Sequence, residues 1–200
     1  MIVITSPIPV NNEAAIINQM FYAGLGLLHI RKPDATALEV RELIESIDSR
    51  YHERLALHQY HEIASDYGIN RLHHTEAERL KQPEKRLTDL RQKGFVLSTS
   101  VHSRECYNTL SGAFNYAFIG PLFDSISKKG YGAMKYTGII EQNNDIKRIA
   151  IGGISKDNLD SKILRAFDGI AILGAIWLSE EPLQEFKLLQ QTWNTTGRHY

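Results

Sequence analysis

The sequence predicts an α/β fold, and within that class a single-domain TIM (β/α)8 barrel. Short apolar segments alternate with helical segments along the whole chain, which is the pattern of a parallel sheet covered by helices. Segments 149–152 and 169–173 are apolar without alternation, as expected of strands buried on both faces, and each leads into a glycine turn. No G-x-G-x-x-G follows the first predicted strand, which disfavours the alternative, a doubly wound open sheet with the same local pattern.

The elements follow from these patterns in chain order. Short apolar or β-branched runs predict strands at 2–5, 27–31, 54–58, 70–73, 95–100, 116–120, 148–152 and 169–173. Apolar residues at helical spacing predict helices within 14–25, 36–48, 60–67, 83–93, 103–111 and 182–193. Thr36 and Glu39 predict a capping box, and Ser155 is expected to cap a helix between the last two strands. We place the barrel domain at 1–193 and a polar C-terminal tail at 194–200.

Composition restricts the kind of partner. Apolar residues make up 42% of the chain and the formal net charge is zero, without a long Lys or Arg block. This balance argues against nucleic acid or an anionic membrane as the main partner. The single cysteine, Cys106, forms no internal disulfide and suits a reducing compartment. We see no basic leader and no apolar run near the ~20 residues that span a bilayer, so we expect a cytoplasmic protein.

The active site of such a barrel lies at the carboxyl ends of its strands. The last two predicted strands end in glycine turns that lead into helical sequence, and backbone N–H groups in such turns bind anions. We therefore predict a phosphate site on Gly152, Gly153, Gly174 and Ala175. Polar residues at the other strand ends complete the candidate site: His29, Arg31, His58, Gln59, His73, His74, Ser98, Ser100, His102 and Lys128.

Residue parity refines this set. His29 and Arg31 are two apart and share one face of a strand, and an inward arginine requires an anion such as phosphate or carboxylate. An ion pair with a helix carboxylate on the outside is the alternative for Arg31. Ser98, Ser100 and His102 share a face in the same way. A rim histidine is suited to proton transfer near neutral pH, although any single histidine can be purely structural.

The histidines have no spacing that indicates a metal site. Adjacent His73 and His74 point to opposite faces of a strand, and His58 could share an ion with His61 only on one helix. H-E-x-x-H is absent. We therefore expect no metal ligands and no resident cofactor.

Five segments together resemble the thiamine phosphate synthase/TenI superfamily over nearly the whole chain: 100–103 (Ser-Val-His-Ser), 120–121 (Gly-Pro), 127–129 (Ser-Lys-Lys), 150–154 and 169–171. The resemblance implies a TIM barrel with one of two activities. Thiamine phosphate synthases join a pyrimidine pyrophosphate to thiazole phosphate with magnesium. TenI-type proteins are thiazole tautomerases, which aromatise a thiazole carboxylate phosphate without a metal.

The match to the synthase pattern is incomplete. Its Gln-x-Arg-x-Lys corresponds here to 29–33 (His-Ile-Arg-Lys-Pro), and its Asn-Asp corresponds to His58-Gln59. Its second magnesium aspartate falls near Glu78. Magnesium prefers hard oxygen ligands, usually carboxylates, which Gln59 cannot supply. The thiazole-phosphate side is retained in outline through Ser127, Lys128, Gly152, Gly153 and Gly174.

We therefore expect a thiazole tautomerase. The resemblance makes His102 the acid/base, and His29 is the second catalytic candidate. Arg31 is expected to hold the substrate carboxylate or to orient His29. Substrate binding is assigned to Arg31, Ser100, Ser127, Lys128, Gly152, Gly153, Gly174 and Ala175, with loop 122–135 suited to close over the phosphate.

Two alternatives stay open. The first is a thiamine-phosphate synthase, which would need magnesium, and the second is a non-catalytic binder of thiazole phosphate or thiamine phosphate. The expected partner is a small-molecule thiazole phosphate in each case, and the sequence leaves formation of a homo-oligomer open.

Overall fold

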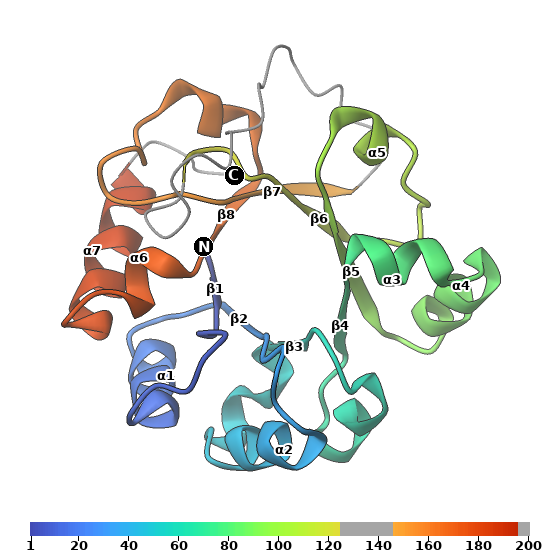
Figure 1. The fold of residues 1–200 in the computed structure, drawn as a ribbon, viewed down its shortest axis with the longest axis horizontal. Helices are drawn as coiled ribbons and strands as arrows, with labels where there is room; N and C mark the ends of the chain where they lie inside the picture. The colour runs from blue at the N-terminus through green and yellow to red at the C-terminus, as the bar shows by residue number, and fades with distance from the viewer. Residues whose placement is uncertain (125–145, 196–200) are drawn as a thin grey trace.

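The chain folds into a closed barrel. A computed structural model describes residues 1–124 and 146–195, apart from the side chain of Ile163. Figure 1 shows its strands as a ring viewed along the barrel axis, with the helices outside the ring. Strands β1 to β8 are parallel and pair in chain order, and β8 pairs with β1 to close the ring. This arrangement confirms the predicted (β/α)8 barrel over the open sheet.

The strands begin and end within one residue of their predicted ends. They are β1 Ile2–Ile4, β2 Leu27–Ile30, β3 Leu55–Leu57, β4 Arg71–His74, β5 Val96–Val101, β6 Tyr116–Ile119, β7 Lys147–Ile151 and β8 Gly169–Ile172. The helices are α1 Glu13–Tyr22, α2 Ala37–Glu45, α3 Glu76–Lys81, α4 Glu84–Gln92, α5 Arg104–Asn108, α6 Gly174–Trp177 and α7 Pro182–Thr195. Three 3-10 helices accompany them: η1 Ser49–Arg54, η2 His61–Tyr67 and η3 Lys162–Ala166. The sequence patterns did not predict α3 or η1.

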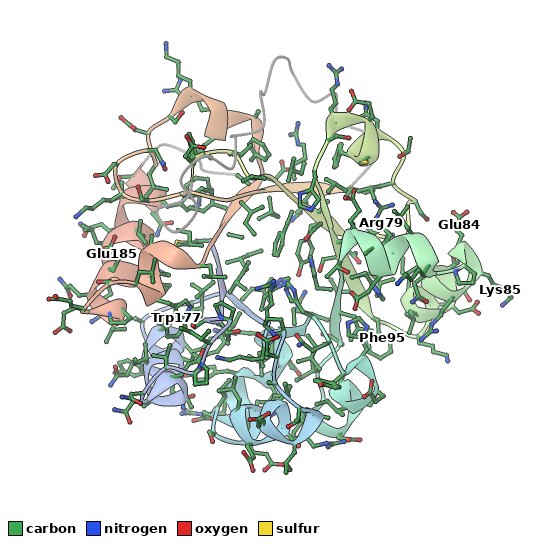
Figure 2. All side chains as sticks on the ribbon, in the orientation of Figure 1. Arg79, Glu84, Lys85, Phe95, Trp177 and Glu185 are labelled. Atoms are coloured by element: carbon green, nitrogen blue, oxygen red, sulfur yellow. The ribbon has the colours of Figure 1, made fainter. Side chains whose placement is uncertain are left out.

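Alternation along each strand divides the apolar residues between two layers. Val3 faces the helices, while Ile2 and Ile4 face the barrel interior together with Tyr116, Phe118, Ile149 and Ala171. Trp177, labelled in Figure 2, belongs to the layer between strands and helices and donates its indole N–H to the Ile4 carbonyl at 2.7 Å. The predicted capping box of Thr36 and Glu39 is present at the start of α2.

The connection from β7 to β8 differs from the prediction, because no helix begins at Ser155. Residues 156–160 form turns, and Ser155 Oγ accepts the Asp157 N–H at 3.3 Å. The Asn158 side chain accepts the Ser155 N–H and donates to the Gly153 carbonyl. Such bonds offer the backbone an alternative to a helix, so the segment stays irregular until η3.

Candidate active site

The ends of β7 and β8 converge on one cavity. Its volume is about 240 Å³, and Gly152, Gly153, Gly174 and Ala175 all line it. A water molecule occupies about 30 Å³ in the liquid, so the cavity has room for a small anionic group. The structure therefore brings the four predicted phosphate-binding residues together, while phosphate binding itself stays a prediction.

The two glycines after β7 have a packing role that the sequence analysis did not foresee. Gly152 and Gly153 have φ angles of 95° and 64°, in the left-handed region that favours glycine. A Cβ atom at Gly152 would lie 2.6 Å from Pro121 Cα, and one at Gly153 would overlap the Phe123 carbonyl. These positions therefore require glycine for the close approach of segment 121–124, whatever ligand the cavity accepts.

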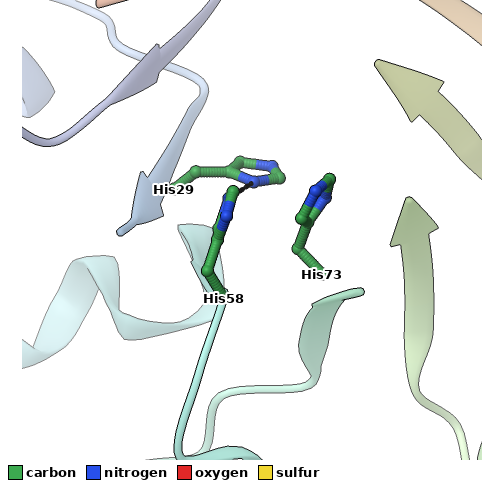
Figure 3. Close-up of side chains that lie close together, drawn as sticks. All are labelled: His29, His58 and His73. Atoms are coloured by element: carbon green, nitrogen blue, oxygen red, sulfur yellow. Dashed lines mark hydrogen bonds between the residues drawn. The ribbon is translucent and has the colours of Figure 1, made fainter. Parts of the chain in front are cut away.

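Three histidines from neighbouring strands meet inside the barrel. Figure 3 shows His29, His58 and His73 with their rings close together. His29 Nδ1 lies 2.9 Å from His58 Nε2 within hydrogen-bond distance, and the rings of His58 and His73 stack with centroids 4.0 Å apart. His29 and His73 are fully buried and His58 is 6% exposed. His58 directly follows β3 at the mouth, so His29 can exchange protons with a ligand only through another group.

Hydroxyl groups hold the remaining nitrogens of this cluster. His29 Nε2 lies 2.8 Å from the Tyr116 hydroxyl. His73 Nδ1 lies 2.9 Å from Ser98 Oγ, and its Nε2 lies 3.0 Å from Ser100 Oγ. The predicted inward direction of Ser98 and Ser100 is therefore correct.

The cluster is held in its neutral form. Burial is the largest effect, and it lowers the pKa of His29, His58 and His73 well below the usual histidine value. Neighbouring positive charges lower the pKa of each histidine further. The charge of Arg31 acts in this way on His58 and His73. Burial also raises the pKa of Tyr116 to about 12. All four groups are uncharged near neutral pH.

The ring geometry does not fit a shared metal ion, although one ligand atom from each histidine lies within 4.8 Å of the others. A metal–nitrogen bond of about 2.0–2.1 Å lies close to the plane of the imidazole ring. The planes of His58 and His73 are only 22° apart and their centroids are 4.0 Å apart. An ion cannot lie in both ring planes at bonding distance without rotation of one ring.

His102 stands on the rim beyond β5. Its side chain is exposed, and Nδ1 lies 2.9 Å from the Gly120 carbonyl oxygen. A carbonyl only accepts, so Nδ1 carries the proton and Nε2 keeps the lone pair when the ring is neutral. In this tautomer Nε2 is the basic nitrogen of a side chain that lies beside the carboxyl ends of β5 and β6.

Arg31 follows β2 and is only partly exposed. Its backbone N–H donates to Thr5 Oγ1 at 2.8 Å, and among the described residues its guanidinium forms no ion pair with a carboxylate. The described residues therefore do not show the alternative predicted for Arg31, an ion pair with a helix carboxylate outside the barrel. Arg31 does not orient His29 either, since both ring nitrogens of His29 have other partners.

The positions that resemble magnesium ligands are engaged locally. Gln59 Oε1 accepts the Lys32 N–H at 3.2 Å and its Nε2 donates to the Lys32 carbonyl. Glu78 Oε2 accepts the backbone N–H and the hydroxyl of Thr75, both at 2.9 Å, in a capping box at the start of α3. An amide and a capping carboxylate are a poor donor set for magnesium, so these residues do not fit the ion.

A larger cavity, of about 560 Å³, lies beside α1 and α2. Lys32 lines it, and Lys32 Nζ forms a buried ion pair with Glu13 Oε2 at 2.5 Å and donates to the Ile8 carbonyl at 3.3 Å. These contacts tie the loops after β1 and β2 together. Lys32, the cation in this cavity, is thus already paired within the protein. For this reason we centre the candidate site on the ends of β7 and β8 and on the histidines.

Some predicted site residues lie elsewhere. His74 points out of the barrel, as predicted from its neighbour, and packs edge-on against His61 with ring centroids 4.8 Å apart. Ser127, Lys128 and most of loop 122–135 lie outside the described residues. Tyr116 was missed as a site residue, because a tyrosine at the start of a strand carries no sequence signal for its hydroxyl partner. In the described part of the chain, no helix is long and apolar enough to cross a bilayer.

Fold and site together define a (β/α)8 barrel with a candidate active site at the carboxyl ends of its strands. Residues 1–176 match the family model described as thiamine monophosphate synthase. The chain belongs to this family, the thiamine phosphate synthase/TenI superfamily, and is thus a member of a thiamine-biosynthesis enzyme family.

Relatives support the same assignment at low identity. The thiamine-phosphate synthase of Streptococcus suis is 25% identical, over 92% of this chain and 84% of the relative. That of Klebsiella pneumoniae is 27% identical, over 84% of this chain and 82% of the relative. The crystal structure of thiamine phosphate pyrophosphorylase from Bacteroides thetaiotaomicron has a TM-score of 0.76 at 24% identity, covering 100% of this chain and 99% of that one. These names agree with the synthase alternative better than with the tautomerase preferred from the sequence.

Proposed function

We propose that this protein is a thiazole tautomerase, which aromatises a thiazole carboxylate phosphate by moving a proton between two ring positions. The observation that carries the proposal is the state of His102. Its Nδ1–H is held by the Gly120 carbonyl at 2.9 Å, so Nε2 carries the lone pair that can accept the proton. The reaction removes one proton and returns one, with no net redox change.

The remaining candidate residues have binding roles in this proposal. Arg31 holds the substrate carboxylate, because its guanidinium has no carboxylate partner among the described residues. The backbone of Gly152, Gly153, Gly174 and Ala175 holds the phosphate in the cavity that these residues line. Ser100, Ser127 and Lys128 are assigned to the substrate from the sequence.

A thiamine-phosphate synthase is the second candidate, and the names of the relatives favour it. Against it stands the donor set, since Gln59 and Glu78 are held by Lys32 and Thr75. Neither residue offers the free carboxylates from which magnesium and a pyrophosphate would be bound. We therefore place the tautomerase first.

The purified protein should be assayed for both reactions, with and without a chelator of divalent metals. We expect conversion of the thiazole carboxylate phosphate at a rate that the chelator does not change, and no coupling of the pyrimidine pyrophosphate. Coupling that the chelator abolishes would establish the synthase instead. Calorimetric binding of thiazole phosphate without either turnover would establish the non-catalytic binder.

A further inference from the structure

The backbone just after β2 is held by two side chains from the neighbouring strand ends. β2 ends at Ile30, so Arg31 and Lys32 lie beyond the paired part of the sheet. Thr5 Oγ1 accepts the Arg31 N–H at 2.8 Å and donates to the Arg31 carbonyl at 3.1 Å. Gln59 Oε1 accepts the Lys32 N–H at 3.2 Å, and Gln59 Nε2 donates to the Lys32 carbonyl. All four polar backbone groups of this dipeptide therefore have a side-chain partner.

The two side chains reach the dipeptide from opposite sides. Thr5 directly follows β1, and Gln59 lies two residues beyond the end of β3. Figure 1 shows β2 between these two strands in the ring. Thr5 is fully buried and Gln59 is partly buried. The side chains thus replace the strand-to-strand hydrogen bonds that would otherwise bind the backbone on each side.

The residues that follow are anchored as well. Lys32 Nζ forms the buried ion pair with Glu13 and donates to the Ile8 carbonyl at 3.3 Å. The Tyr60 hydroxyl donates to the Ala35 carbonyl at 2.7 Å. Segment 31–35 is therefore fixed at several points to the loops after β1 and β3.

The Arg31 side chain differs from its well-anchored backbone. It is half-buried, and among the described residues no carboxylate forms an ion pair with its guanidinium. Burial is the main cause of the low pKa of His58 and His73, and the charge of Arg31 lowers it further. The guanidinium is therefore close enough to the barrel interior to act on these rings. A fixed backbone that carries a cation without a counter-ion is suited to bind an anion.

We propose that Thr5 and Gln59 are positioning residues that hold Arg31 ready to bind the substrate carboxylate. The proposal rests on the proposed function, in which Arg31 holds that carboxylate while His102 moves the proton. Thr5 and Gln59 act only through the backbone of segment 31–32. Because this backbone is ordered before the substrate arrives, binding does not have to order it, which strengthens the interaction with the carboxylate.

Two variants of nearly unchanged size remove these contacts. Thr5→Val removes the hydroxyl and keeps the branched shape, and Gln59→Met removes the amide and keeps the length. Thr5→Ser restores the hydroxyl. Asn18→Leu is the matched control, because the Asn18 amide also binds two backbone groups: it accepts the Asp48 N–H at 2.9 Å and donates to the Ser46 carbonyl at 3.1 Å. These groups lie just before η1, on the side of the barrel where β3 begins.

Backbone order is measured first, in the ligand-free protein by ¹⁵N relaxation. In Thr5→Val and in Gln59→Met, the order parameter of the Arg31 N–H should fall from about 0.85 towards about 0.6. Asn18→Leu and Thr5→Ser should keep the wild-type value. The result for Gln59→Met is the stricter one, because Gln59 contacts only Lys32. An unchanged order parameter at Arg31 in either variant would overturn the positioning role of that residue, whatever the protein's activity.

Calorimetry supplies the second measurement, in a His102→Gln background that slows conversion of the substrate. The two ligands are thiazole carboxylate phosphate and thiazole phosphate, which lacks the carboxylate. Thr5→Val and Gln59→Met should each raise the Kd of the carboxylate ligand by about 3- to 10-fold, the range of one hydrogen bond, and leave that of thiazole phosphate unchanged. Asn18→Leu should change neither Kd. Equal weakening of both ligands would show a general structural loss and overturn the proposal.

A double variant tests whether Thr5 acts through Arg31. Once Arg31→Met has removed the guanidinium, adding Thr5→Val should not weaken the carboxylate ligand further. A second loss of full size would overturn the proposal. Equal affinity of the parent protein for both ligands would also overturn it, because Arg31 would then not bind the carboxylate. A preference for the carboxylate ligand without turnover by the wild type would overturn the tautomerase and leave the positioning role standing.

Discussion

Replacement of Gly152 by alanine tests the packing of the β7 turn against segment 121–124. Gly152 combines a φ of 95° with a Cβ position 2.6 Å from Pro121 Cα. Gly68 has a φ of 68° but nothing within 4 Å of its Cβ position, and Gly112 has neither a positive φ nor a close neighbour. The three positions therefore separate backbone strain from steric overlap.

The expected free energies of unfolding follow from these differences. Gly112→Ala should leave stability unchanged or raise it by about 0.4–1 kcal/mol, because alanine restricts the unfolded chain. Gly68→Ala should lower stability by about 1–2 kcal/mol through the left-handed backbone alone. Gly152→Ala adds overlap with Pro121, for which overpacking costs of about 1–3 kcal/mol are typical, so its total loss should be about 2–5 kcal/mol.

Thermal or urea unfolding of the three variants measures these losses. One kcal/mol shifts Tm by about 2–4 °C in a protein of this size, so Gly152→Ala should melt clearly below Gly68→Ala. Equal losses at the two positions would show that Gly152 does not pack against Pro121. Steric contact with Pro121 would then not be what requires glycine at this position.

Three further predictions concern charged and titratable groups. Lys32→Met should lower stability by about 3–5 kcal/mol at pH 7, because it leaves the Glu13 carboxylate buried without its partner. Burial already raises the pKa of Glu13 from 4.5, so this loss should shrink as the pH falls towards 4.5 and the carboxyl group is protonated; an equal loss at both pH values would contradict the assignment. Burial lowers the pKa of His74 from 6.5 to about 4, so the folded state binds fewer protons than the unfolded state and stability should fall as the pH drops through that window. His74→Leu should remove up to about 3 kcal/mol of this dependence in urea titrations, with the share of the other buried histidines remaining. Arg31→Met should raise KM for the carboxylate substrate by about 10- to 100-fold, with partial recovery in Arg31→Lys, and an unchanged KM would remove Arg31 from the site.

Local patterns predicted those features that depend on one segment. The strict period of two along a strand placed Ser98 and Ser100 in the interior, and both contact His73 there. The same period correctly predicted that the side chains of His73 and His74 point to opposite faces of their strand. The capping box of Thr36 and Glu39 also depends only on neighbouring residues.

Features that depend on several segments could not be derived in this way. His29, His58 and His73 meet because of the stagger between β2, β3 and β4, which one strand alone does not reveal. Tyr116 reaches His29 from across the barrel for the same reason. The sequence predicted phosphate binding at Gly152, but it did not reveal that Pro121 closes the Cβ position of that residue. Ser155 was assigned to a helix that the side chain of Asn158 replaces with turns.

The central claim is that His102 moves the proton, and the His102→Gln variant tests it most directly. Glutamine keeps a similar size and can still donate to the Gly120 carbonyl, but it has no group that titrates near neutral pH. Turnover of the thiazole carboxylate phosphate should fall by about 10²–10⁴-fold, while Tm and substrate binding stay close to wild type. Turnover at the wild-type rate, or a parallel loss of Tm and activity, would show that His102 is structural.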